Sequence, residues 1–407
     1  MTRNRLTVLG FASIGHLFTH MMMLIYATVV LRLETEWQID YGTLVALAST
    51  GWLLFGLGAL PAGWLADRWT APGMMAVLFF GLGGASIATG FASSPGEIAV
   101  GLAAIGLFAA IYHPVGIPWL LRHGGDRKGL AVGINGFFGA VGIAVAPLVA
   151  VVCADAFGWR GAFFVPGGLM IAIGVAHVLM SPKDVPVEAD KPGTVPPRLR
   201  DPATIRLILA LMVIAFSAGL IFHGTAVAMP KMFETGIRDF AAAVMGADAV
   251  DTSLFVTVIY LFGGCCQMLV GGLADRMPGR RTMFMVAYAV QIPVLATLGW
   301  LGGAPMAAVA LLAVSLQLGF QSLEDLLVVR SVPSSWLSRV FATRFVVGMG
   351  AGVLAPTLVG FGYAWSGDFS AVFLVFGALA AVVALAASQL PSDRSTAATR
   401  PAPVPAE

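Results

Sequence analysis

The chain has 407 residues, of which 58% are hydrophobic and only 11% are charged. Soluble proteins carry about 25% charged residues, so this composition indicates a polytopic membrane protein rather than a set of soluble domains. The formal net charge is +2 and no run of basic residues is present, which argues against a nucleic-acid partner.

Twelve apolar segments follow one another along the chain, each long enough for a membrane-spanning helix, which needs about 20 residues. The short alternating segments of a membrane barrel are absent, so we predict an all-α polytopic membrane protein. The predicted spans cover residues 7–31, 42–65, 72–91, 98–121, 130–153, 161–180, 205–229, 252–274, 282–301, 304–328, 340–363 and 369–390.

A proline-rich and charged stretch at 181–203 interrupts this series after the sixth span. It predicts a cytoplasmic linker between an N-terminal six-helix bundle at 1–180 and a C-terminal six-helix bundle at 204–390. Residues 391–407 are rich in Ser, Thr, Ala and Pro, and we expect a disordered cytoplasmic tail.

The distribution of Lys and Arg sets the orientation, because basic residues favour the cytoplasmic side. With both termini in the cytoplasm, 19 of the 23 basic residues lie inside. We therefore expect a multi-pass protein of a bacterial-type cytoplasmic (inner) membrane. The outer segment 231–251 is long, and its apolar residues predict a short interfacial helix. These residues are Ile237, Phe240, Ala241 and Val244.

One motif occurs twice: Gly63-Trp-Leu-Ala-Asp67-Arg68 returns as Gly271-Gly-Leu-Ala-Asp275-Arg276. A spacing of about half the chain indicates a duplicated architecture. The glycines allow close approach of a neighbouring helix, and a carboxylate at the membrane surface is suited to cap a helix N-terminus.

Twelve helices with this motif after helices two and eight resemble the major facilitator superfamily of transporters. The resemblance implies two pseudo-symmetric bundles and a cytoplasmic latch in which Asp67 holds the start of helix eleven, with Arg339 or Arg344 as ion partner. A second repeat supports the duplication: Ala146-Pro147 in helix five corresponds to Ala355-Pro356 in helix eleven. Helix five also resembles the glycine-rich motif of proton-coupled antiporters at Gly133 and Gly142, although glycine-rich packing alone explains it equally well.

Ionisable residues at membrane depth are costly and point to function. His16 and His20 share one face of helix one, and His113 lies between Tyr112 and Pro114 in helix four. In the resembled family, helices one, four, seven and ten line the cavity. We expect His20, with His113 or Glu324, to carry a coupling proton. A second set would orient a polar substrate: His16, Tyr112, His223, Gln317 and Gln321.

Within helix ten, Glu324 is the better cavity candidate and Asp325 is expected at the interface, because adjacent residues do not share a helix face. For His223 taken alone, a hydrogen-bonded packing role is favoured over substrate binding. The segment Tyr112-His113-Pro114, together with His16, resembles the fosmidomycin-resistance-like exporters, a branch that carries an acid where this chain has His20.

These features predict a monomeric secondary active transporter that moves a small polar molecule, zwitterionic or weakly acidic, by alternating access and with protons. No enzymatic motif or cofactor-binding loop is present. Two alternatives stay open. Soft ligands in apolar segments would suit a transition-metal or metal-chelate transporter; they are Met21, Met22, Met23, Cys265, Cys266 and Met268. The other alternative is a non-transporting membrane assembly factor.

Overall fold

The computed structural model describes residues 3–66, 68–123, 128–182, 202–245, 252–276, 279–332 and 334–391, except for some side chains near the helix ends. These residues form α-helices joined by short turns, and twelve helical segments are long and apolar enough to cross a membrane. The all-helical prediction with twelve spans is confirmed.

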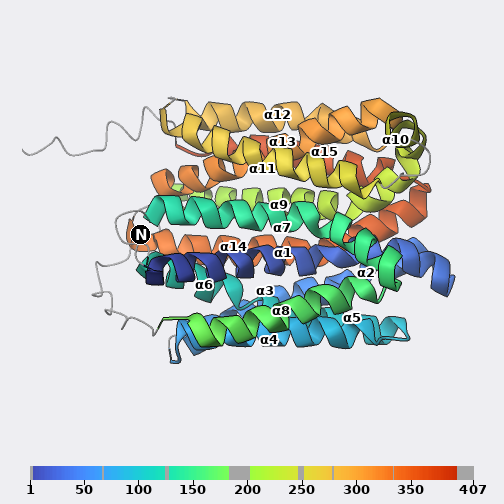
Figure 1. Ribbon diagram of the computed structural model, residues 1–407. Helices are drawn as coiled ribbons and strands as arrows, with labels where there is room; N and C mark the ends of the chain where they lie inside the picture. Colours follow the sequence, from blue (N-terminus) through green and yellow to red (C-terminus); the bar gives the residue numbers. More distant parts are fainter. Residues whose placement is uncertain are drawn as a thin grey trace, which may run out of the picture.

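The helices run back and forth along one axis, and the start of α1 (Arg3–Trp37) and the short helix α10 (Arg238–Met245) lie at opposite ends of the molecule (Figure 1). The first six spans are α1 (Arg3–Trp37), α2 with α3 (Tyr41–Ala46 and Ala48–Ala66), α4 (Ala71–Gly90), α5 with α6 (Pro95–Ala109 and Tyr112–His123), α7 (Lys128–Phe157) and α8 (Gly161–Met180). The last six are α9 (Pro202–Gly236), α11 (Ser253–Arg276), α12 (Arg280–Leu298), α13 (Gly303–Ser331), α14 (Ser334–Ser366) and α15 (Ser370–Ala387).

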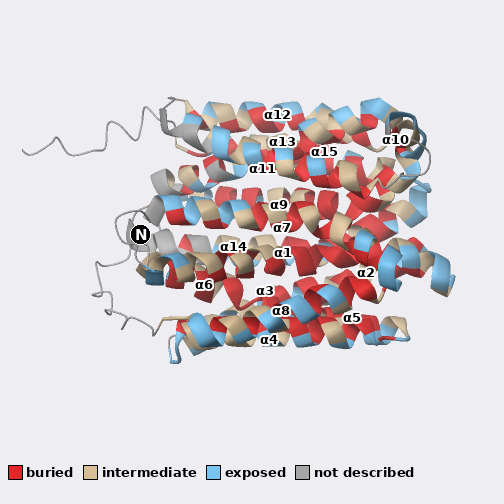
Figure 2. Cartoon of the chain, in the orientation of Figure 1, coloured by how far each residue is buried: buried red, intermediate tan, exposed pale blue. Residues whose placement is uncertain are grey.

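Most packing occurs within each set of six. In the first, α1 packs on α7, α4 on α8 and α3 on α5; in the second, α11 packs on α13, α12 on α15 and α14 on α9. The two sets meet where α14 lies against α2 and α3, and where α11 lies against α7. Buried residues concentrate along α1 and the other central helices, while exposed residues alternate with buried ones along the outer helices (Figure 2), as expected for spans with one face toward lipid.

Two predicted spans are interrupted. The second divides at Leu47, and the fourth divides at Ala110 and Ile111. Pro114 explains the second break, because proline has no backbone N–H for the carbonyl one turn before it and its ring crowds that carbonyl. The break lies immediately before Tyr112 and His113, so it sets the direction in which these side chains leave the backbone.

The α1 helix continues well past the predicted end at residue 31, to Trp37. The next helix, α2, begins at Tyr41 and is capped by Asp40, whose side chain accepts a hydrogen bond of 2.8 Å from the Thr43 N–H. This N-cap bond to the charged carboxylate holds the pKa of Asp40 below its ordinary value. The chain therefore turns tightly between spans one and two.

The predicted outer helix forms as α10 (Arg238–Met245), and α9 takes up the first part of the expected loop. Ile237 and Ala241 are fully buried, whereas Val244 is exposed. The apolar side of this segment thus packs largely against protein rather than against the membrane interface. Most of the predicted linker and tail, at 183–201 and 392–407, lies outside the described residues.

The first and last six spans touch closely along an outer seam, formed by Gly42, Ser49 and Trp52 on one side and Gly352, Thr357 and Gly360 on the other. A methyl group on Gly42 would lie 2.7 Å from the Gly360 carbonyl oxygen, and the Ser49 and Thr357 hydroxyls are 3.0 Å apart. Such backbone proximity needs small residues, as at other membrane helix crossings.

Candidate functional site

Three imidazole rings meet between α1 and α6: His16, His20 and His113, called here the histidine cluster. The ring centroids of His16 lie 4.8 Å from those of His20 and 5.3 Å from those of His113, and the other pair is 5.6 Å apart. One nitrogen from each ring lies within 4.8 Å of the other two. The structure thus brings together His20 and His113, and their role in carrying the coupling proton stays a prediction.

The hydrogen bonds of His16 fix the proton positions in the neutral cluster. Its Nδ1 lies 2.8 Å from the Asn135 carbonyl oxygen, which only accepts, so Nδ1 carries the hydrogen. Nε2 of neutral His16 then holds a lone pair, and Nε2 of His20, at 3.1 Å, donates to it. This leaves Nδ1 of His20 as a basic nitrogen.

Tyr112 and Asn135 form the support behind His16. The Tyr112 ring stacks on His16 with centroids 4.6 Å apart and planes at 15°. Its hydroxyl donates to Asn135 Oδ1 at 2.9 Å and accepts from Asn135 Nδ2 at 2.7 Å. Asn135 is buried and was not among the predicted site residues. A single amide side chain within an apolar span is the sequence feature that indicates such a residue.

Glycines in α7 allow this arrangement. A methyl group on Gly139 would collide with the His16 ring, and one on Gly142 would collide with the Leu17 backbone. The glycine spacing in helix five therefore brings α7 against the helix that carries two of the three histidines.

His223 does not join the histidine cluster directly. Its ring lies 4.3 Å from that of Trp52 on α3, and a row of aromatic contacts leads from Trp52 through Phe55 to His113, with centroid separations of 5.8 and 6.0 Å. Nδ1 of His223 and Nε1 of Trp52 are buried without a hydrogen-bond partner in the described part of the chain. This aromatic row connects α9 with the histidine cluster.

The polar residues of α13 separate from one another. The Gln317 amide donates to the Thr225 hydroxyl at 3.3 Å, Gln321 is exposed, and Glu324 is buried in an ion pair with Arg344 of α14. The ion partner of Glu324 in the structure is therefore Arg344, and the role of Glu324 in carrying the coupling proton with His20 stays a prediction.

The guanidinium of Arg344 binds both adjacent acids of α13, Glu324 and Asp325. Nη2 of Arg344 contacts Glu324, and Nη1 lies 3.1 Å from Asp325. The flat, wide fork of arginine reaches two neighbouring carboxylates at once, a contact that was not predicted from the sequence. Asp325 remains largely exposed, as its predicted position at the interface requires.

The predicted gating residues are only partly described. Gly63 faces Pro114, and Arg68 lies over the Trp64 ring at 4.0 Å while donating to the Trp64 carbonyl. Arg344, expected near Asp67, is engaged by the acids of α13. Other members of the latch lie outside the described residues or side chains: Asp67, Gly271, Asp275, Arg276 and Arg339.

The soft ligands suggested for a metal do not form one group. Met21, Met22 and Met23 are buried in the core, whereas Cys265 and Met268 are exposed. The nitrogens of the histidine cluster are the candidate metal ligands among the described residues.

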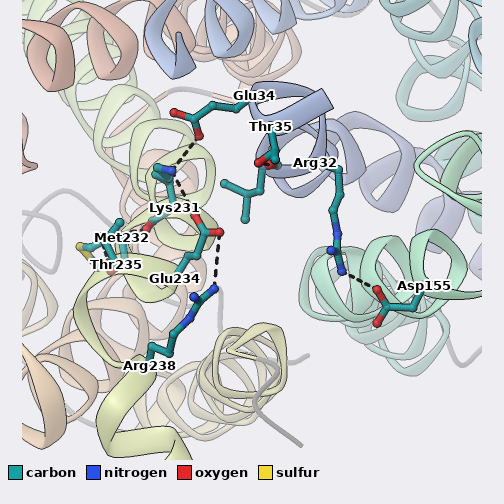
Figure 3. Close-up of polar contacts among 10 residues, drawn as sticks. Arg32, Glu34, Thr35, Asp155, Lys231, Met232, Glu234, Thr235 and Arg238 are labelled. Atoms are coloured by element: carbon teal, nitrogen blue, oxygen red, sulfur yellow. Dashed lines mark hydrogen bonds and ion pairs between the residues drawn. The ribbon is translucent and has the colours of Figure 1, made fainter. Parts of the chain in front are cut away.

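Charged residues gather near the C-terminal ends of α1, α7 and α9, called here the outer ends (Figure 3). Lys231 donates to Glu34 at 2.7 Å and to Glu234 at 3.1 Å, and Arg32 is paired with Asp155. Glu36, a little further along α1, accepts from the Trp159 indole at 3.0 Å. The outer end of α1 is therefore tied both to its own set of spans and to α9.

Comparisons with known proteins all point to membrane transporters. The sequence pattern of the Major Facilitator Superfamily matches residues 12–347. A gentisate transporter of Corynebacterium glutamicum is 24% identical over 393 residues, covering 90% of this chain and 83% of the relative. Two crystal structures of a bacterial homologue of the human lysosomal transporter Spinster, both inward-facing, one unoccupied and one occupied, superpose with TM-scores of 0.73 and 0.75 at 14% identity. They cover 99% of this chain and 100% of theirs.

Proposed function

Because the chain belongs to the Major Facilitator Superfamily, and so is a membrane transporter rather than an enzyme, we propose that it moves a small weakly acidic molecule together with protons. The two bundles at 1–180 and 204–390 would rock about the central site, opening it to each side in turn. The protein would work as a monomer and need no cofactor.

The proposal of proton coupling rests on the direction of the hydrogen bonds within the histidine cluster. Asn135 and His16 fix the direction of each bond, so His20 presents a free basic nitrogen near the bilayer middle. Imidazole takes up a proton near neutral pH, and the charge would be shared with His16 through the bond between their Nε2 atoms. Glu324, held by Arg344, is a weaker candidate than His113 for the second proton carrier.

An aromatic acid is the substrate class that the site favours. A protonated histidine cluster offers N–H donors and positive charge to a carboxylate, while Trp52 and Phe55 offer flat apolar surface to a ring. The gentisate transporter, related over most of both chains, supports this class. His223, Gln317 and Gln321 would contact the polar substituents of the substrate, and Tyr112 would hold His16 in place.

The repeated motif would form the cytoplasmic gate. We assign this role to Gly63, Asp67, Arg68, Gly271, Asp275, Arg276 and Arg344. Neutralising Asp67 should then favour states open to the cytoplasm, and a cysteine-accessibility assay that finds no shift would remove Asp67 from the gate.

Export is the second candidate direction, favoured by the resemblance of Tyr112-His113-Pro114 to an exporter branch. In that case protons would exchange against the substrate rather than accompany it. The direction changes which gradient drives accumulation, but not the residues that bind the proton.

The test uses purified protein in liposomes with an imposed pH gradient. Radiolabelled gentisate should accumulate when the gradient is present and equilibrate when an ionophore collapses it. The sign of the gradient that drives uptake distinguishes co-transport from exchange. Unchanged accumulation without a gradient would refute proton coupling, and transport of unrelated solutes in place of aromatic acids would refute the substrate class.

A further inference from the structure

The histidine cluster has the composition and spacing of a metal site. We propose that His16, His20 and His113 bind a divalent transition-metal ion of the zinc type through one ring nitrogen each. This inference rests on the positions of the nitrogens and does not require that they carry protons during transport.

The nitrogens are nearly placed for tetrahedral binding. Zinc binds histidine nitrogen at about 2.0–2.1 Å, which puts neighbouring ligand nitrogens roughly 3.3 Å apart. The Nε2 atoms of His16 and His20 are 3.1 Å apart, and all three ligand nitrogens lie within 4.8 Å of one another. A small inward movement of His113, which follows the break between α5 and α6, would complete the three-ligand set.

The surroundings orient the first ligand. Metal-binding histidines commonly donate their second N–H to a carbonyl or carboxylate, which fixes the ring and directs the other lone pair to the ion. His16 does this through Nδ1 and the Asn135 carbonyl, while Tyr112 stacks on its face. His20 would join by moving its hydrogen from Nε2 to Nδ1, so metal binding needs no change in the charge of either ring.

Three imidazoles are neutral and leave the two charges of the ion uncompensated. Three histidine ligands with an open fourth position are the arrangement in which zinc retains an exchangeable ligand. In a buried site an anion is favoured there, and the carboxylate of an aromatic acid has the required chemistry. The ion and a weakly acidic substrate would then bind together, a consequence that rests on the proposed function.

Binding can be measured on the full-length protein without any gradient. A purification tag without histidine is removed, and the protein is titrated with Co²⁺, whose tetrahedral complexes absorb visible light. We expect one Co²⁺ per chain, displaced by Zn²⁺. His20→Ala and His113→Ala should each weaken binding at least tenfold, because even the loss of a residue that only orients a ligand typically costs about 10–100-fold in metal affinity.

Two further variants make the outcome decisive. His113→Cys supplies another zinc ligand at the same position and should keep Zn²⁺ binding. That result would show that His113→Ala loses binding because the ligand is missing and not because the protein misfolds. His123→Ala is the matched control, because His123 bonds the Trp119 carbonyl outside the cluster. Absence of saturable Co²⁺ absorption, or equal binding by wild type and both alanine variants, would overturn the metal site while leaving aromatic-acid transport intact. Metal binding without aromatic-acid transport would refute only the proposed substrate.

Discussion

The ammonium group of Lys231 on α9 donates at 2.7 Å to the carboxylate of Glu34 on α1, and so joins the first six spans to the last six at their outer ends (Figure 3). Lys231 also bonds Glu234, one turn along its own helix. The bond to Glu34 has to break if these two helices separate on the outer side, whereas the bond to Glu234 can persist. The pair is therefore suited to act as an outer latch.

Glu34→Gln should weaken this latch and increase the population of outward-open molecules. The side chains are 12% and 28% exposed, so the pair is partly screened, and its loss should cost about 1 kcal/mol, or roughly a fivefold population change. Spin-label distances between the outer ends of α1 and α9 would report it. Glu234→Gln is the control, because that bond lies within one helix; an equal shift in both variants would contradict the latch.

Replacing the basic nitrogen of the histidine cluster should uncouple transport. In His20→Asn, gentisate exchange between the two sides should continue, while accumulation driven by the pH gradient should fall at least tenfold, because asparagine does not take up a proton near neutral pH. Counterflow and gradient-driven uptake in the same liposomes separate the two activities. His123→Asn serves as control, and full gradient-driven uptake by His20→Asn would contradict the assignment.

The sequence was sufficient for the spans because long apolar runs have few other uses in a chain of this composition. It also placed His16 and His20 on one face, since their spacing is local. The support from Asn135 was not predictable, because it depends on how α7 packs against α1, more than 100 residues away in sequence. The contact of Arg344 with both acids was not predictable either, because it depends on the packing of α14 and on the reach of the arginine side chain. Local periodicity carries no information about either.

The Tyr112–Asn135 pair should be energetically coupled. Tyr112→Phe removes the hydroxyl that Asn135 both donates to and accepts from, and leaves a buried amide unsatisfied, which costs about 1–3 kcal/mol. Asn135→Leu should also destabilise, but the double variant should cost less than the sum by about 1 kcal/mol. Thermal unfolding in detergent of the four proteins would measure this; additive effects would show that the two residues act independently.

Close packing at the outer seam makes Gly42 sensitive to substitution. In Gly42→Ala the new methyl group would lie 2.7 Å from the Gly360 carbonyl oxygen, so α2 and α14 must move apart. Outer-side cysteine accessibility should rise and transport should slow severalfold. Gly84→Ala is the matched control, since no atom lies within 4 Å of its added methyl group. Equal behaviour of the two variants would mean that α2 and α14 can separate without functional effect.

Glu324 and Arg344 should behave as a buried ion pair, so that losing one partner destabilises the protein more than losing both. Both side chains are only 10% exposed, so Arg344→Gln leaves a desolvated carboxylate and should destabilise the protein by about 3 kcal/mol. Removing the charge from Glu324 as well should recover a large part of this loss, because the uncompensated buried charge disappears. Thermal unfolding of Arg344→Gln, Glu324→Gln and the double variant tests the argument. A double variant that is less stable than Arg344→Gln would show that the carboxylate of Glu324 is stabilised by groups other than Arg344.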